Sequence, residues 1–193
     1  GLPVAKLPEL GGGQPNVVDQ AGLEALAKQA NGGAIKRPDG KDVKSVVFVQ
    51  CAGQRDTTGQ HLPYCSGHCC ATSIKQAMYF KDANPDIDTM VMYTDLRVPG
   101  TGEDFYRSGQ QKGITFTKGK TASVEAAGSD GKGACKVNFK DLILNEDVTV
   151  EADLVVLATG MVANSGMNID IPEEEVAKME VKPIPFKVTY KFD

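Results

Sequence analysis

The sequence VVFVQC at residues 46–51 is the stretch that decides the fold class. Its first four residues are β-branched or aromatic without interruption, which is typical of a strand buried on both faces of a parallel sheet. Similar short runs follow at residues 90–93, 114–117 and 154–157, and helix-forming segments separate the first three runs. This order predicts an α/β fold built on a three-layer, Rossmann-like parallel sheet.

The segments between and around these runs complete the expected topology. Helices are expected within residues 17–30, 71–80 and 103–113, each with apolar residues at helical spacing or a Gly stop signal. Residues 121–150 alternate polar and apolar, with turns predicted at 129–131 and 145–147, which indicates an antiparallel β-meander.

The two ends of the chain have a different character. Residues 1–16 are rich in Gly and Pro and resemble a linker, and we expect them and residues 166–193 to be irregular or loosely attached. The first residue is Gly rather than Met, and no signal peptide is evident. This suggests an excised piece of a longer cytoplasmic chain or a processed terminus, and the excised piece is the favoured interpretation.

Composition excludes several classes of function. Hydrophobic residues make up 41% of the 193 residues, which is enough for a packed core. The net charge is −4 and no basic stripe occurs, so nucleic-acid binding through phosphate neutralisation is not expected. No run of about 20 apolar residues is present, so direct membrane insertion is not expected either.

Four of the five cysteines lie within residues 51–70, namely Cys51, Cys65, Cys69 and Cys70. Without a secretion signal, such a tight group favours metal or redox chemistry in a reducing compartment over a disulfide framework. Cys51 directly follows a predicted strand and the other three precede a helix. We therefore expect all four thiols at one strand end, where the helix N-terminus favours thiolates.

Four converging thiolates suit an iron–sulfur cluster or a zinc ion. The Cys-x13-Cys-x3-Cys-Cys spacing differs from the separated Cys-x2-Cys pairs of structural zinc sites and favours the cluster. Adjacent cysteines diverge by about 100° on a regular helix, so they share a centre only in irregular backbone. A metal-free dithiol and buried structural cysteines stay open, as does a ligand role for His61 or His68. Cys135 stands alone on a predicted meander strand and is expected in the core.

Residues 51–56, CAGQRD, stand where a dinucleotide-binding domain has its Gly-x-Gly-x-x-Gly turn. Because those glycines are missing, we expect no useful affinity for NAD(P)H. Asp95 and Arg97 follow the second strand, where an acid binds a ribose hydroxyl and an Arg binds a 2′-phosphate. An Asp–Arg pair that fixes the loop is the favoured interpretation. Thr159 and Gly160 are small residues that let a cofactor come close or simply end the last strand.

Several motifs together resemble one family. They are FVQCAGQRD at residues 48–56, YCSGHCC at 64–70, IKQA at 74–77, YTDLR at 93–97, EDFY at 103–106 and ADLVVLATGM at 152–161. The set is similar to the heterodisulfide reductase A family over roughly residues 31–165. The Cys-Ala-Gly form and HLPY at residues 61–64 are similar to one branch, the A subunit of the quinone-interacting membrane-bound oxidoreductase complex.

The resemblance implies a thioredoxin-reductase-like flavoprotein that carries FAD and [4Fe–4S] clusters. It implies that Cys51, Cys65, Cys69 and Cys70 hold a cluster and that Thr159 and Gly160 lie near FAD. The partners would be other subunits of a cytoplasmic oxidoreductase complex, including a membrane quinone-reactive subunit that brings the complex to the membrane.

The same resemblance implies a domain organisation. Residues 1–44 would be a linker and helix belonging to a truncated FAD domain, and 45–165 a pseudo-nicotinamide-nucleotide domain. Residues 166–193 would return toward the other half of the FAD domain. This piece alone would be an inactive part of an oxidoreductase subunit. The alternatives are an NAD(P)H-binding domain of a pyridine nucleotide-disulfide oxidoreductase and a structural zinc-binding docking domain.

Overall fold

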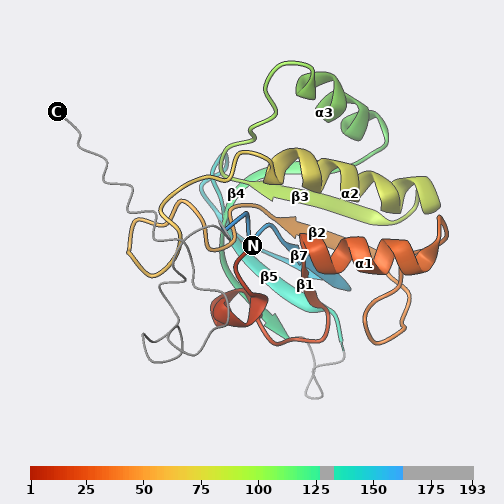
Figure 1. The fold of residues 1–193 in the computed structure, drawn as a ribbon, viewed down its shortest axis with the longest axis horizontal. Helices are drawn as coiled ribbons and strands as arrows, with labels where there is room; N and C mark the ends of the chain where they lie inside the picture. The colour runs from red at the N-terminus through yellow and green to blue at the C-terminus, as the bar shows by residue number, and fades with distance from the viewer. Residues whose placement is uncertain (127–132, 163–193) are drawn as a thin grey trace, which may run out of the picture. The chain divides into compact units, whose positions relative to one another are not determined.

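The computed structural model describes residues 1–126 and 133–162, and its centre is a seven-stranded sheet (Figure 1). The order of the strands across the sheet is β1-β7-β2-β3-β4-β5-β6. The strands are β1 (Val17–Asp19), β2 (Ser45–Val49), β3 (Asp88–Tyr93), β4 (Thr115–Ala126), β5 (Cys135–Asp141), β6 (Asp147–Ala152) and β7 (Leu154–Leu157).

Five of these strands form the parallel part of the sheet, from β1 through β7, β2 and β3 to the first half of β4. In the centre, Val47 of β2 lies opposite Val155 of β7 on one side and Met90 of β3 on the other. The four apolar runs of the sequence are therefore neighbouring parallel strands, as predicted. The continuous apolar character of the runs in β2 and β7 follows from burial on both faces, whereas β4 is partly exposed at Thr115.

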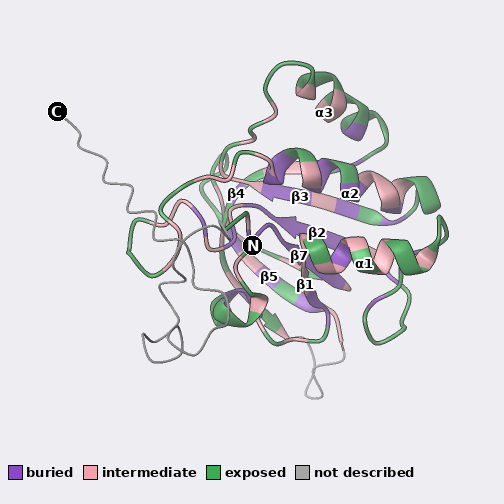
Figure 2. Ribbon diagram, in the orientation of Figure 1, coloured by how far each residue is buried: buried purple, intermediate pink, exposed green. Residues whose placement is uncertain are grey.

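Three helices pack on one face of the parallel strands: α1 (Gln20–Ala30), α2 (Cys69–Ala83) and α3 (Gly102–Gln111). The colouring by burial shows that α2 has most of the buried residues, whereas α1 and α3 are mainly intermediate or exposed (Figure 2). An apolar cluster lies between the helices and the sheet. In it, the rings of Phe48 in β2 and Phe80 in α2 pack edge to face, with their centroids 6.3 Å apart. Such aromatic pairs add to the stabilisation that burial alone gives.

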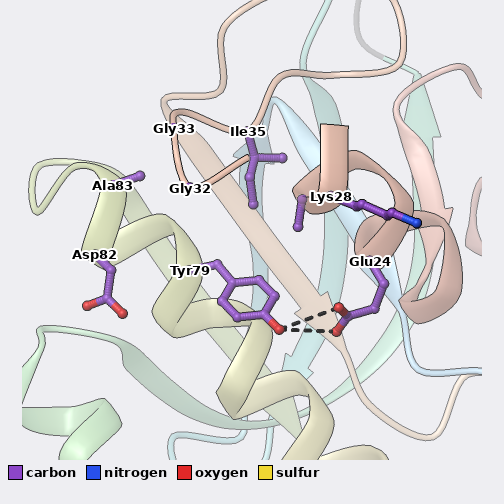
Figure 3. A pocket seen from close by; sticks show the side chains of 9 residues that line it. Glu24, Lys28, Gly32, Gly33, Ile35, Tyr79, Asp82 and Ala83 are labelled. Atoms are coloured by element: carbon purple, nitrogen blue, oxygen red, sulfur yellow. Dashed lines mark hydrogen bonds between the residues drawn. The ribbon is translucent and has the colours of Figure 1, made fainter. Parts of the chain in front are cut away.

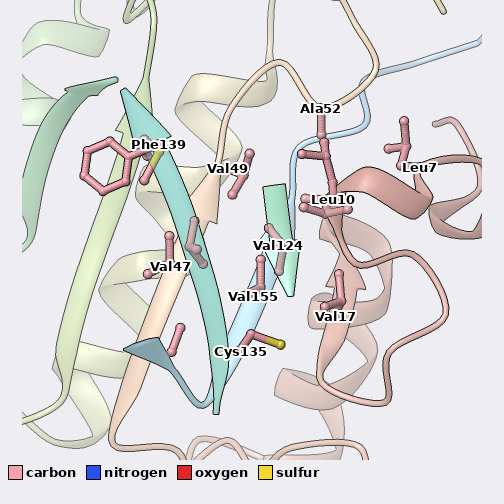
Figure 4. Close-up of a cluster of buried hydrophobic side chains, with 14 residues drawn as sticks. Leu7, Leu10, Val17, Val47, Val49, Ala52, Val124, Cys135, Phe139 and Val155 are labelled. Atoms are coloured by element: carbon pink, nitrogen blue, oxygen red, sulfur yellow. The ribbon is translucent and has the colours of Figure 1, made fainter. Parts of the chain in front are cut away.

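The antiparallel meander covers the opposite face. Strand β4 pairs with β3 as far as Lys118 and from Gly119 onward pairs antiparallel with β5, with a register shift between Thr121 and Ser123. Strand β5 pairs in turn with β6. A Cβ atom at Gly119 would lie 2.8 Å from the Phe139 ring, so glycine allows this close approach. Figure 4 shows the second apolar cluster between the two layers. Cys135 is fully buried in it, which confirms its predicted place in the core.

The helix expected over residues 17–30 is wrong at its start. Val17–Asp19 is strand β1, and the helix begins only at Gln20. The Asp19 carboxylate accepts a hydrogen bond of 2.7 Å from the Gly22 backbone N–H and caps the helix. Such a cap satisfies an N–H that has no partner within the helix, so it sets the boundary.

The expectation that residues 1–16 are loosely attached is also wrong. This segment forms two short 3-10 turns, Val4–Lys6 and Pro8–Leu10, and places Leu7 and Leu10 in the cluster beneath the meander. Residues 1–160 form one compact unit. Two further expectations, the turn at 129–131 and the character of residues 166–193, lie outside the described residues.

In the part of the chain that the structure describes, no helix combines the length and apolar character needed to cross a bilayer.

The buried N-terminal segment leads to a prediction about stability. Leu7 is fully buried, so Leu7→Ala should lower the free energy of unfolding by about 2–5 kcal/mol through lost burial and a residual cavity. Leu144 is 66% exposed, and Leu144→Ala should change it by no more than about 0.5 kcal/mol. Urea unfolding of both variants measures the difference. Equal, small effects would show that the segment does not contribute to the core.

Candidate functional site

The candidate site lies at the carboxyl edge of the parallel strands. Cys51 comes two residues after β2, Asp95 two residues after β3, and Thr159 two residues after β7. Cys69 and Cys70 open α2, the helix that follows β2. In open α/β sheets, ligands bind at this edge, where the loops after neighbouring strands meet.

All four clustered cysteines line one cavity, as expected from the topology. Cys51 and Cys65 are half-buried, whereas Cys69 and Cys70 are buried at 7% and 6% exposure. The walls lie close together and leave a cavity volume of only about 10 Å³. The remaining wall is formed by Gln50, Gln54, Arg55, Gly67, Asp95 and Arg97.

The thiols are close enough to influence one another, but they do not surround a single point. Within residues 1–126 and 133–162, no three cysteine, histidine, aspartate or glutamate side chains are placed as ligands of one metal ion. All five cysteines are free thiols. Gathering three of these thiols around one zinc ion would therefore require the loop between β2 and α2 to move.

The two adjacent cysteines lie in the first turn of α2 rather than in irregular backbone before it. Both thiols still line the cavity, because the cavity lies at the N-terminal end of α2 and these are the first two residues of that helix. Cys69 Sγ accepts from the Gln54 amide, and Cys70 Sγ lies 3.9 Å from the Asp95 carbonyl oxygen. Whether a pair in the first turn of a helix can share one centre stays a prediction.

Burial governs the electrostatics of two of the thiols. It raises the pKa of Cys51, an effect that the hydrogen-bonded Arg55 guanidinium opposes. Burial likewise raises the pKa of Cys70, against a hydrogen bond from the Arg97 backbone N–H. Desolvation disfavours a charged thiolate, and neighbouring thiolates disfavour it further. Both effects favour the protonated thiol of these two residues over the thiolate.

The acid after β3 is paired, but with a different arginine from the one expected. Asp95 and Arg55 form an ion pair of 2.7 Å, whereas Arg97 reaches the cysteine cavity through its backbone N–H. The Arg55 side chain also hydrogen-bonds Cys51. The Asp95 carboxylate thus fixes a cation beside a thiol, and Arg55 lowers the pKa of Asp95.

Gln54 connects the parts of the site, although the sequence pattern did not single it out. Its Nε2 donates to Cys69 Sγ at 3.4 Å and to the Ala158 carbonyl at 3.1 Å. Its Oε1 accepts from Ser66, at 3.1 Å from the backbone N and 2.6 Å from Oγ. One buried amide therefore joins the end of β7, the first turn of α2 and the loop that carries Cys65.

Gly160 lies directly against this amide. Its backbone has φ of +71°, and an added Cβ would overlap the Gln54 amide group. Thr159 is buried, and its carbonyl accepts a hydrogen bond of 3.2 Å from the Leu2 backbone N–H. A contact of Thr159 and Gly160 with FAD stays a prediction.

Gln50, the last residue before Cys51, was also missed by the sequence analysis. It is 7% exposed and lines the cysteine cavity. Among the described residues, neither its Nε2 nor its Oε1 has a hydrogen-bond partner. A buried amide without partners costs free energy unless a bound group supplies them, so Gln50 is a candidate ligand-binding side chain.

The two histidines have protein partners of their own. His61 Nε2 lies 3.5 Å from a Glu9 carboxylate oxygen, and His68 Nδ1 lies 3.3 Å from the Ser66 carbonyl oxygen. Neither residue lines the cysteine cavity.

A second hollow lies between α1 and α2, away from the cysteines (Figure 3). The Glu24 carboxylate on its wall accepts hydrogen bonds from Tyr79 and Gln76 and pairs with Lys75 at 2.6 Å. Because this carboxylate is engaged by three neighbours, it supports the packing of α1 on α2.

Comparison with curated proteins identifies the family. The chain is 37% identical over 152 residues to the iron–sulfur A subunit of CoB–CoM heterodisulfide reductase from Methanocaldococcus jannaschii, which covers 76% of this chain and 22% of that protein. It is 34% identical over 185 residues to the A 1 form of the same subunit in Methanopyrus kandleri, which covers 91% and 26%. This chain belongs to the heterodisulfide reductase A family. It spans about a quarter of the length of these relatives.

No protein-family profile matches the chain. Among solved structures, the thioredoxin reductase of T. acidophilum has a TM-score of 0.44 at 12% identity and covers 78% of this chain and 38% of its own. L-lysine 6-monooxygenase of Pseudomonas syringae has a TM-score of 0.47 at 13% identity and covers 80% and 42%.

The contact between Gly160 and Gln54 gives a prediction for this family member. Gly160→Ala should destabilise the fold by about 1–3 kcal/mol more than Gly32→Ala, because the new methyl group displaces an amide that makes four hydrogen bonds. Gly32 is the matched control: its φ is +84° and nothing lies within 4 Å of an added Cβ. Denaturant unfolding compares the two. Equal losses would mean that only backbone strain matters.

Asp56 orders the loop that leads to Cys65. Its carboxylate accepts from the backbone N–H groups of His61 at 2.8 Å and Thr58 at 3.0 Å. These bonds hold the pKa of Asp56 far below its usual range. A lowered folded-state pKa stabilises the fold above the ordinary value of about 3.9, and this contribution is lost as pH falls below it.

The predicted consequence is a pH-dependent effect of Asp56→Asn. At pH 6 the variant should unfold at lower urea concentration than the unaltered chain, because it lacks the ionised acceptor. The gap between the two urea midpoints should narrow toward pH 2.5, because the carboxylate of the unfolded chain is then protonated and part of the contribution of Asp56 is lost. A gap that stays constant from pH 6 to pH 2.5 would contradict the assigned role.

Proposed function

We propose that this chain is the pseudo-nicotinamide-nucleotide domain of an electron-transfer subunit in a heterodisulfide-reductase-like or quinone-linked oxidoreductase complex. In this proposal, Cys51, Cys65, Cys69 and Cys70 hold a [4Fe–4S] cluster. The observation that carries the proposal is the convergence of four thiols from two segments of the chain on one cavity at the carboxyl edge of the sheet.

The donor set fits a cluster. Iron–sulfur clusters of this type take four cysteine thiolates, one for each iron, and so hold the sulfurs farther apart than a single ion does. The support for a cluster is the donor set itself, four thiols that line one cavity.

The polar surroundings support the same assignment. The buried Gln50 amide has no hydrogen-bond partner, so its N–H groups are available to donate to the sulfur atoms of a cluster. Gln54 already donates to Cys69 Sγ, and the Arg55 cation hydrogen-bonds Cys51. A cluster with four thiolates carries net negative charge, and donors and cations around it reduce the cost of burial.

The proposal extends to a flavin and to partner subunits. Thr159 and Gly160 end β7 at the same edge and would lie near FAD, as the family resemblance implies. Relatives are named as A subunits of heterodisulfide reductases, one of them dependent on ferredoxin or F(420)H(2). We extend this to partners of the intact protein, including a membrane quinone-reactive subunit.

The chemistry would be electron relay. When bound, the cluster supplies one-electron redox steps and FAD supplies two-electron steps. The residues of this chain bind and orient: the four thiolates ligate, the Arg55–Asp95 pair fixes a positive charge beside Cys51, and Gln54 fixes Cys69.

Iron analysis of cysteine variants tests the proposal. In the full-length polypeptide that carries this segment, reconstituted anaerobically with iron and sulfide, Ser in place of Cys51, Cys65, Cys69 or Cys70 should remove about four iron atoms. The electron paramagnetic resonance signal of this cluster after dithionite reduction should disappear. Cys135→Ala is the matched control, since Cys135 is buried in the core away from the cavity.

One outcome would end the proposal. If the variant with all four cysteines replaced keeps the complete iron content of the unaltered protein, these thiols do not hold a cluster. They would then be structural residues or a dithiol pair. Loss of iron in Cys135→Ala alone would instead point to a different set of ligands.

A further inference from the structure

Gln54 has a contact set that goes beyond holding the loop in place. It is 7% exposed, and its amide nitrogen donates to the sulfur of one proposed ligand, Cys69, at 3.4 Å. The orientation of the amide is fixed by its other neighbours. The Ser66 backbone N–H can only donate and therefore requires Oε1, which turns Nε2 toward Cys69 Sγ and the Ala158 carbonyl.

We propose that Gln54 is a positioning residue that raises the reduction potential of the cluster by donating its N–H to Cys69 Sγ. This inference rests on the proposed function, since it assumes a cluster on Cys69. One neutral side chain would thus help to set the reduction potential of the cluster.

The physical reason is the charge change on reduction. If a bound cluster took up one electron from a reduced flavin, no bond would form or break, and the amide proton would stay on Nε2. The thiolate sulfur becomes more negative, so a hydrogen bond to it strengthens and stabilises the reduced state over the oxidised state. Hydrogen bonds to the sulfurs are one of the main determinants of cluster potentials.

Burial and anchoring make this donor effective. In a site screened from water, a hydrogen bond to charge is worth more than at the surface. Three further hydrogen bonds, two from Ser66 and one to Ala158, keep the amide from rotating away. Gly160 leaves the space that the amide occupies. The donor is thus preorganised, and no rearrangement accompanies electron arrival.

The decisive variant is Gln54→Met in the full-length polypeptide. Met has a similar shape and no N–H donor. At a fixed potential near the midpoint, the ratio of reduced to oxidised cluster should fall on the order of tenfold, the effect of about one charge-assisted hydrogen bond. For a one-electron couple this is a negative shift of about 60 mV. A redox titration followed by electron paramagnetic resonance measures it on the signal that Cys69→Ser abolishes.

Gln76→Met is the matched control. Gln76 is a fully buried glutamine that donates to the Gln20 carbonyl at 2.8 Å and to Glu24 at 2.9 Å. It lies about two helical turns from Cys69 on the same helix. Its substitution removes two hydrogen bonds from the core, so a similar loss of stability without a shift in potential is expected.

Ser66→Ala tests the same hydrogen bond independently. It leaves the Gln54 amide in place but removes the hydroxyl that anchors Oε1 at 2.6 Å. The potential should shift in the same direction by a smaller amount. This variant decides the question if Gln54→Met fails to bind iron.

Unchanged or raised potentials in Gln54→Met and Ser66→Ala, with iron content intact, would overturn the inference and leave the cluster assignment standing. A shift in Gln76→Met as large as that in Gln54→Met would also overturn it, because general loosening would then be the cause. Full iron content in the protein with all four cysteines replaced would overturn the proposed function itself.

Discussion

The layered fold and the position of the candidate site both depend on the complete burial of β7. All four residues from Leu154 to Leu157 are inaccessible to solvent, and the strand is hydrogen-bonded to β1 on one side and β2 on the other. Leu154 and Val156 face the helices, and Val155 and Leu157 face the meander. A strand of this kind needs cover on both faces, which leaves the strand ends as the place where loops can form a site.

The parts of the fold that follow from this constraint could be predicted from the sequence. Continuous apolar runs mark β2, β3 and β7, and their order indicates a parallel sheet. Strand β1 was not predicted, because the apolar spacing of its three residues continues into that of α1. The burial of Leu7 and Leu10 was not predicted, because the surrounding Gly and Pro residues suggested a linker. Two buried apolar side chains are enough to anchor such a segment to the core.

The site was predicted as far as topology reaches. A cysteine after β2, one in the loop that follows and two at the start of α2 are expected at one edge of the sheet, and the structure places all four on one cavity. Gln54 could not be predicted, because its contacts depend on the path of the turn. Cys51, Gly53 and Arg55 all have positive φ, which only glycine signals in a sequence. Its partner Ala158 is 104 residues away, beyond any local pattern.

The same turn explains why the glycine fingerprint is missing. Strand β2 lies between β3, which follows it through α2, and β7, which the chain reaches only after the meander. A nucleotide-binding fold uses the crevice at such a reversal of strand order for a pyrophosphate. Here the Gln54 side chain occupies the space beside Gly160 and is bonded to the end of β7. A group placed against Gly160 would have to displace an amide with four hydrogen bonds. The same amide donates to Cys69 Sγ, so one residue of the turn both takes the space beside Gly160 and contacts the first turn of α2.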